Sequence, residues 1–194
     1  TVELCKLLID NGADVNFVGK DGCTPLHTAC RIQKEFTIEL YKLLIDNGAN
    51  KIIDFIDKDG CTPLHTACRN QTDSTVELCK LLIDNGADVN FVGKNRYTPL
   101  HTACETECTV ELCKLLVDNG ADVNSCDKHG NTPLHTICIN HSKFITFTKD
   151  YEWFYSSKDD KSFLRDISAK ELDYMIYICK CLLDHGADAN VQNE

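Results

Sequence analysis

One heptapeptide recurs through this chain at nearly constant spacing. TPLHTAC occupies residues 24–30, 62–68 and 98–104, and the near copy TPLHTIC occupies 132–138. A second motif keeps the same phase: LLIDNGADVN fills 7–16, and close copies begin at Leu43, Leu81, Leu115 and Leu182. The heptapeptide prolines follow one another at intervals of 38, 36 and 34 residues. Self-similarity at this period predicts a solenoid of stacked repeats.

The heptapeptide has the chemistry of a helix start. Thr24 is a good N-cap, and Pro25 suits the first helical position, where its missing N–H costs nothing. His27 falls at N3, from which a side chain reaches back to the cap as Glu does in a capping box. Three small residues follow and let a neighbouring helix approach closely, namely Thr28, Ala29 and Cys30. Each copy therefore predicts the start of one helix per repeat.

The second motif predicts a second helix and then a turn. In VELCKLLIDNG at 2–12, apolar residues cover a wide arc while Glu3, Lys6 and Asp10 share one strip, so we expect this helix to be buried on most sides. Gly12 is typical of a left-handed C-cap. The segment from ADVN to the next TPLH, closed by Asp21-Gly22, predicts a hairpin-like turn. In the third copy Asn95-Arg96 replaces Asp-Gly, which predicts slight strain in that turn.

A helix pair and an extended turn at this period, carrying TPLHTA and LLxxGADVN in phase, resembles the ankyrin repeat family. The resemblance implies an all-α solenoid with projecting hairpin-like fingers, used for binding other proteins. We expect one array over 1–194: a partial repeat at 1–20, full repeats at 21–58, 59–94 and 95–128, and a last repeat at 129–194 with an insertion at about 141–173.

The insertion is the part of the chain least similar to the repeats. It is rich in aromatic residues and contains the only Trp, Trp153, close to Tyr155. One interpretation is that these rings pack over the open end of the stack, because aromatic side chains usually pack. The other is a recognition loop with Trp153 and Tyr155 as anchors, since Trp and Tyr dominate binding hot spots.

Composition and spacing exclude several classes of function. A formal net charge of −10 disfavours nucleic acid as a partner, because phosphate binding depends on cations. No apolar run approaches the roughly 20 residues of a membrane span. The thirteen cysteines are odd in number and mostly sit at fixed places in the repeat, so we expect reduced thiols and an intracellular, cytoplasmic location.

The His-x-x-Cys pairs predict neither a metal site nor an enzyme. Stacked helices lie about 8–10 Å apart, whereas zinc ligands lie within about 2.3 Å of one ion. The pairs therefore form a ladder and do not converge, and each His already has a structural role at N3. Since the recurring His, Cys and Asp are accounted for by the repeat, we expect no catalytic residue, no cofactor and no metal.

The remaining expectation is a non-enzymatic protein-interaction module, a scaffold or adaptor. The alternative is a substrate-recruiting segment of a larger enzyme or ubiquitin-ligase adaptor, including host-interaction proteins of viruses or pathogens. In the family the partner surface is the concave side, formed by finger tips and exposed first-helix positions. Besides Trp153 and Tyr155, the residues that this implies are Lys20, Asp21, Arg31, Lys58, Asp59, Arg69, Lys94, Arg96, Tyr97, Lys128 and His129.

Two further expectations concern these fingers. A lysine occurs at every finger tip. One interpretation is that these lysines are only solvated, and the other is that they form a row of cations that meets an acidic segment of the partner. The resemblance also implies that the last Asn of GADVN, here Asn16, Asn90 and Asn124, is a possible site of hydroxylation. The alternative interpretation is structural, namely that this Asn makes hydrogen bonds within its turn.

Overall fold

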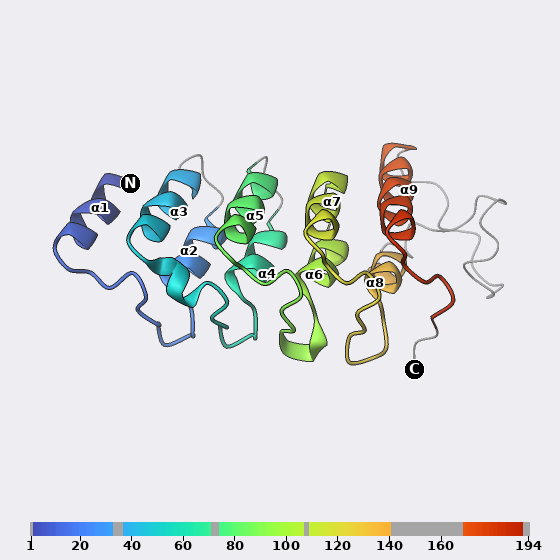
Figure 1. The fold of residues 1–194 in the computed structure, drawn as a ribbon, viewed down its shortest axis with the longest axis horizontal. Helices are drawn as coiled ribbons and strands as arrows, with labels where there is room; N and C mark the ends of the chain where they lie inside the picture. The colour runs from blue at the N-terminus through green and yellow to red at the C-terminus, as the bar shows by residue number, and fades with distance from the viewer. Residues whose placement is uncertain (1, 33–36, 71–73, 107–108, 141–168, 192–194) are drawn as a thin grey trace.

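The chain forms two layers of helices. The computed structural model describes residues 2–32, 37–70, 74–106, 109–140 and 169–191, and every element within these ranges is helical. The outer layer contains α1 (Val2–Asp10), α3 (Thr37–Asp46), α5 (Thr75–Asp84), α7 (Val110–Asp118) and α9 (Ala169–Asp184), and the inner layer contains α2 (Pro25–Arg31), α4 (Pro63–Cys68), α6 (Pro99–Glu105) and α8 (Pro133–Asn140) (Figure 1). Loops that leave each outer helix project beneath the inner layer as fingers. The predicted all-α solenoid is confirmed.

Each inner helix begins at the predicted cap. Thr24 is extended, with φ −90° and ψ 166°, and Pro25 opens the helix. The backbone N–H of His27 donates to Thr24 Oγ1 over 3.4 Å, and the backbone N–H of Thr24 donates to His27 Nδ1 over 3.2 Å. The same reciprocal pair recurs at Thr62 with His65, Thr98 with His101 and Thr132 with His135.

The cap histidines also join one repeat to the next. Because Nδ1 accepts a hydrogen bond from the cap, the ring proton lies on Nε2. Nε2 of His27 donates to the carbonyl of Cys61 over 2.9 Å. The equivalent bonds run from His65 to the carbonyl of Tyr97 over 3.2 Å and from His101 to the carbonyl of Asn131 over 3.0 Å. Each ring thus holds its own helix start and the finger of the following repeat.

The core lies between the two layers. Leu26, Leu64 and Leu100 of the inner helices are fully buried, as are the alanines and cysteines of the same motif. Cys68 Sγ of α4 lies 3.9 Å from Cys79 Sγ of α5. This contact between the two helices of one repeat was not predicted, because only equivalent cysteines of different repeats were compared. Burial raises the pKa of Cys138 to about 12 and that of Cys179 to about 11, so these thiols stay protonated.

The first helix departs from the prediction that every second helix is buried on most sides. No residue of α1 is buried, and Leu4, Leu7 and Leu8 are each more than half exposed. The prediction is wrong for α1 because α3 supplies most of its contacts, whereas α5 and α7 pack between two outer helices and against an inner one. The sequence of this helix is that of a buried element, but its surroundings here cover only one side.

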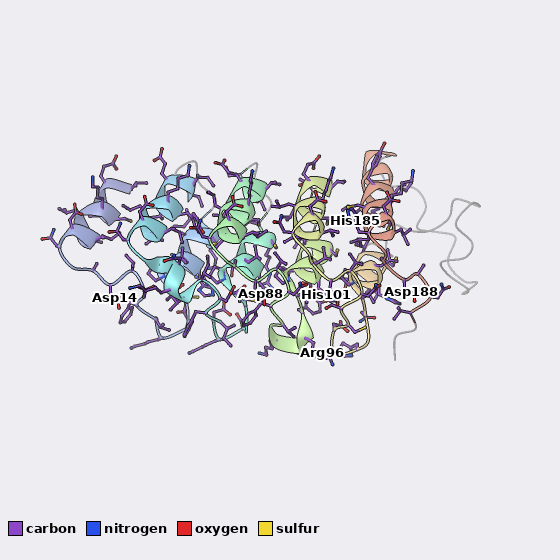
Figure 2. The ribbon with its side chains drawn as sticks, viewed as in Figure 1. Asp14, Asp88, Arg96, His101, His185 and Asp188 are labelled. Atoms are coloured by element: carbon purple, nitrogen blue, oxygen red, sulfur yellow. The ribbon has the colours of Figure 1, made fainter. Side chains whose placement is uncertain are left out.

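The asparagine at the end of GADVN links successive fingers. Asn90 Nδ2 donates to the carbonyl of Gly120 over 2.8 Å, and Asn90 Oδ1 accepts from the backbone N–H of Asp122 over 2.7 Å. Asn124 makes the same two bonds with Gly186 and Asp188. Figure 2 shows Asp14, Asp88 and Asp188 at one level of the array, where the outer helices pass into the fingers.

The second repeat interrupts this series. Its finger contains the short 3-10 helix η1 (Ala49–Ile52), and Asp54 stands where other repeats have Asn. The Asp54 carboxylate accepts from the backbone N–H of Asp88 over 3.1 and 3.2 Å, but it has no N–H to donate. In the preceding repeat, Asn16 Oδ1 is buried without a hydrogen-bond partner among the described residues. Burial raises the pKa of Asp54, because water no longer stabilises its ionised form.

Replacing Asp54 with Asn should stabilise the fold at neutral pH. The amide would keep the bond from Asp88 and add a donor like that of Asn90, for a gain of about 1 kcal/mol in the free energy of unfolding. A raised pKa means that the stability contributed by Asp54 is full below its ordinary pKa and is lost as pH rises through the folded-state value. The gain from Asp54→Asn should therefore shrink near pH 4.

Urea unfolding at neutral and acidic pH measures this difference between Asp54→Asn and the unmodified chain. The reciprocal change Asn90→Asp is the matched control and should lower the free energy of unfolding at neutral pH, since it removes the amide donor to Gly120. Equal or lower stability of Asp54→Asn at neutral pH would contradict this account of the finger series.

The cap histidines predict loss of stability in weak acid. Burial lowers the pKa of His27 and His101, and lowers that of His65 to about 4. An unfolded histidine titrates near 6.5, so the stability contributed by the neutral rings is present above about pH 6.5 and is lost as pH falls through the folded-state value. His65 alone should cost about 2 kcal/mol between pH 7 and 5.

Chemical denaturation across this pH range tests the histidine prediction. The matched variant is His65→Gln, because Gln at N3 retains a capping side chain but does not titrate. Its free energy of unfolding should fall less steeply between pH 7 and 5 than that of the unmodified chain. Identical slopes for the two chains would show that His65 is not the buried neutral group described above.

Candidate partner-binding surface

The fingers are hairpin-like turns, as predicted. In the first finger the backbone N–H of Gly19 donates to the carbonyl of Cys23 over 2.9 Å, and the second finger has the equivalent bond from Asp57 to Cys61 over 3.0 Å. The third and fourth fingers are closed in the same way, by Gly93 with Tyr97 and by Asp127 with Asn131. The turn that follows each closing residue presents one lysine at the tip.

Backbone hydrogen bonds tie the finger tips to one another. The N–H of Lys58 donates to the carbonyl of Asp21 over 3.0 Å, that of Lys94 to Gly60 over 3.3 Å, and that of Lys128 to Asn95 over 2.9 Å. A Cβ added to Gly60 would lie 2.6 Å from the Cβ of Lys94, so the absence of a side chain at Gly60 permits this contact. The tip lysines are therefore held at regular positions while their side chains remain exposed.

The third finger carries the predicted strain. Asn95 and Arg96 have φ of 61° and 62°, in the left-handed region that other fingers occupy with glycine. The local turn is the short 3-10 helix η2 (Lys94–Arg96). A residue with a Cβ pays roughly 1–2 kcal/mol for this conformation. Figure 2 shows Arg96 at the tip of the finger, away from the helices.

A cavity of about 520 Å³ lies between the second, third and fourth fingers and the inner helices α4, α6 and α8. It is lined in part by six of the predicted residues, namely Asp59, Arg69, Lys94, Tyr97, Lys128 and His129. Lys20, Asp21, Arg31, Lys58 and Arg96 are exposed but lie outside its lining. Trp153 and Tyr155 lie outside the described residues.

Threonines of the heptapeptide also line the cavity, and the sequence analysis missed them. Thr102 and Thr136 occupy the position after the cap histidine, and both face the cavity. Burial raises the pKa of Tyr97, against the opposing effect of a hydrogen bond with Thr136. The sequence does show a Thr after the His in every copy of the motif, but this Thr was interpreted only as a small residue that permits close helix packing.

The cap histidines beside this surface are occupied by structural hydrogen bonds. Both ring nitrogens of His27, His65 and His101 are hydrogen-bonded, so none of these rings has a nitrogen left for a metal ion or a substrate proton. Within the described ranges, no three His, Cys, Asp or Glu side chains gather where they could hold a metal ion. No helix in those ranges combines the length and apolar character that crossing a membrane requires.

The possible hydroxylation sites differ in their surroundings. Asn90 and Asn124 are exposed, but each amide donates to a carbonyl of the next finger and accepts from a backbone N–H there. Asn16 is half-buried, and its Oδ1 atom is the buried one described above. The structural role of this Asn is therefore established in two repeats, while its modification stays a prediction.

Comparison with protein families agrees with this geometry. A family model described as ankyrin repeats in three copies matches residues 1–91 and again residues 73–159. No curated protein matches the chain. The matched residues contain all four copies of the TPLHT motif and the fingers that follow α1, α3, α5 and α7. The chain belongs to the ankyrin repeat family.

Proposed function

We propose that this chain is a non-enzymatic protein-interaction module that binds its partner along the finger tips and the adjoining cavity. Ankyrin repeats are in general protein–protein interaction modules. The observation that carries the proposal is the row of exposed lysines, held one repeat apart by backbone bonds beside a cavity of about 520 Å³. A regular row of like charges favours a partner whose own charges repeat along an extended segment.

The charge of the surface favours an acidic partner segment. Among the described residues, none of Lys20, Lys58, Lys94 and Lys128 forms an ion pair with a carboxylate. The chain as a whole has a net charge of −10, so the charge of these lysines is opposite in sign to that of the whole chain. Unpaired cations on a fixed backbone steer an anionic partner and speed its association. The overall negative charge argues against nucleic acid.

Several finer assignments belong to the same proposal. An intracellular location accords with the free cysteines among the described residues. A role as the recruiting segment of a larger enzyme or ligase adaptor would use the same surface. The repeat boundaries, the hydroxylation of Asn16, Asn90 and Asn124, and the anchoring role of Trp153 and Tyr155 are proposed from the sequence alone.

Charge reversal at the tips tests the proposal. The variant Lys94→Glu, Arg96→Glu, Lys128→Glu should slow association with a fluorescein-labelled oligoglutamate peptide by about tenfold at low salt, with a smaller effect at high salt. The matched control is Lys42→Glu, Lys80→Glu, Lys114→Glu, which makes the same charge change at exposed positions of the outer helices. Stopped-flow fluorescence measures the rates. Equal slowing by both variants, or by neither, would reject the finger surface as the binding site.

A further inference from the structure

The inner helices do not present the same chemistry in every repeat. Two positions flank the TPLHT-x-C motif, and the residue just after the motif contacts, or lies beside, the residue just before the motif. In the first full repeat Arg31 Nη1 donates to Cys23 Sγ over 3.5 Å, and in the second Arg69 Nη2 donates to Cys61 Sγ over 3.9 Å. Both guanidinium groups are exposed, and neither forms an ion pair with a carboxylate among the described residues. The end of the surface formed by α2 and α4 therefore presents two exposed guanidinium groups that a partner carboxylate could reach.

The opposite end of the surface is different. Glu105 takes the place of arginine in α6, and Ile139 takes it in α8, where 46% of its surface is exposed. Tyr97 replaces the cysteine and is half-buried, with its ring centroid 5.2 Å from that of His101. Tyr97, Glu105 and Ile139 all line the cavity. An aromatic ring and an aliphatic side chain beside a cavity are the usual elements of an apolar anchor site.

We infer that the surface has a direction, and that it takes an extended peptide segment with carboxylates at the α2–α4 end and a large apolar side chain at the α6–α8 end. The inference rests on the proposed function and adds the order of the partner's side chains. Arg31 and Arg69 supply bidentate donors that match carboxylates. Tyr97 and Ile139 exclude water around the apolar group. The exposed carboxylate of Glu105, which lies on the inner helix α6 and not at a finger tip, keeps acidic residues out of that apolar position.

The repeat spacing sets the length of the segment. Neighbouring inner helices lie about 8–10 Å apart, which an extended chain covers in about three residues at 3.3 Å each. Arg69 and Ile139 are two repeats apart, so the carboxylate that meets Arg69 should precede or follow the apolar anchor by about six residues. Glu105 together with Asp59 and Asp127 in the cavity lining disfavours a polyphosphate chain, whose charge is uniform along its length.

Selection from a random-peptide display library on the full chain tests the inference. We expect enriched peptides to pair acidic residues with one large apolar residue about six positions away. Arg31→Glu, Arg69→Glu should weaken binding of a synthetic enriched peptide at least tenfold, as should Ile139→Asp, while Lys42→Glu, Lys80→Glu should leave it unchanged. All substituted positions are exposed, and circular dichroism confirms that each variant keeps its helices.

The outcomes separate the inference from the proposed function. Charge reversal at Lys94, Arg96 and Lys128 tests the finger surface, and changes at Arg31, Arg69 and Ile139 test the direction. If only the first set weakens binding of the peptide, the inferred direction is wrong and the proposed finger surface is retained. If no peptide is enriched, or enriched peptides ignore every concave-side variant, both fail. Tighter binding of a mixed-sequence single-stranded DNA oligonucleotide than of any enriched peptide would also overturn both, because it would show that the surface selects uniform negative charge.

Discussion

The stacking of the repeats depends on the cap histidine, whose ring makes two structural hydrogen bonds. His27, His65 and His101 each accept a hydrogen bond from their own Thr through Nδ1 and donate through Nε2 to a carbonyl of the next finger. The ring must be neutral with its proton on Nε2 for both bonds to exist together. Burial favours that state by lowering the pKa of the ring. Helix starts and the contacts between repeats are thus stabilised by the same group, which explains why the motif recurs almost unchanged.

Because the motif residues serve the fold, they limit where the proposed binding surface can lie. The cap threonine, the histidine and the cysteine of the motif are buried or hydrogen-bonded, whereas its second threonine lines the cavity in α6 and α8. The position that follows the motif is exposed and differs between repeats, as Arg31 and Ile139 show. The fingers keep their tips together through backbone bonds, which leaves the lysine side chains available. The positions that stabilise the fold and those of the proposed binding surface are therefore largely separate within each repeat.

Much of this structure could be predicted from the sequence, because its main features are local. The caps at Thr24 and Thr62, the hairpin-like fingers and the strain at Asn95 and Arg96 all follow from short-range chemistry. Features that depend on packing could not be predicted. The Cys68–Cys79 contact requires the distance between two helices, and the exposure of α1 depends on which neighbours cover it. The finger surface was predicted by register, but the cavity and its threonines appear only when three repeats are assembled.

The hydrogen bond from the cap histidine to the next finger is the contact that couples neighbouring repeats. Native-state hydrogen exchange of His65→Gln tests this coupling most directly, since Gln retains a capping group for α4 but lacks the ring N–H that donates to the carbonyl of Tyr97. We predict that the amides of α4 keep their protection, while those of Gly93 and Tyr97, which close the third finger, exchange faster than in the unmodified chain. Unchanged protection of that finger would contradict the claim that the histidine couples neighbouring repeats.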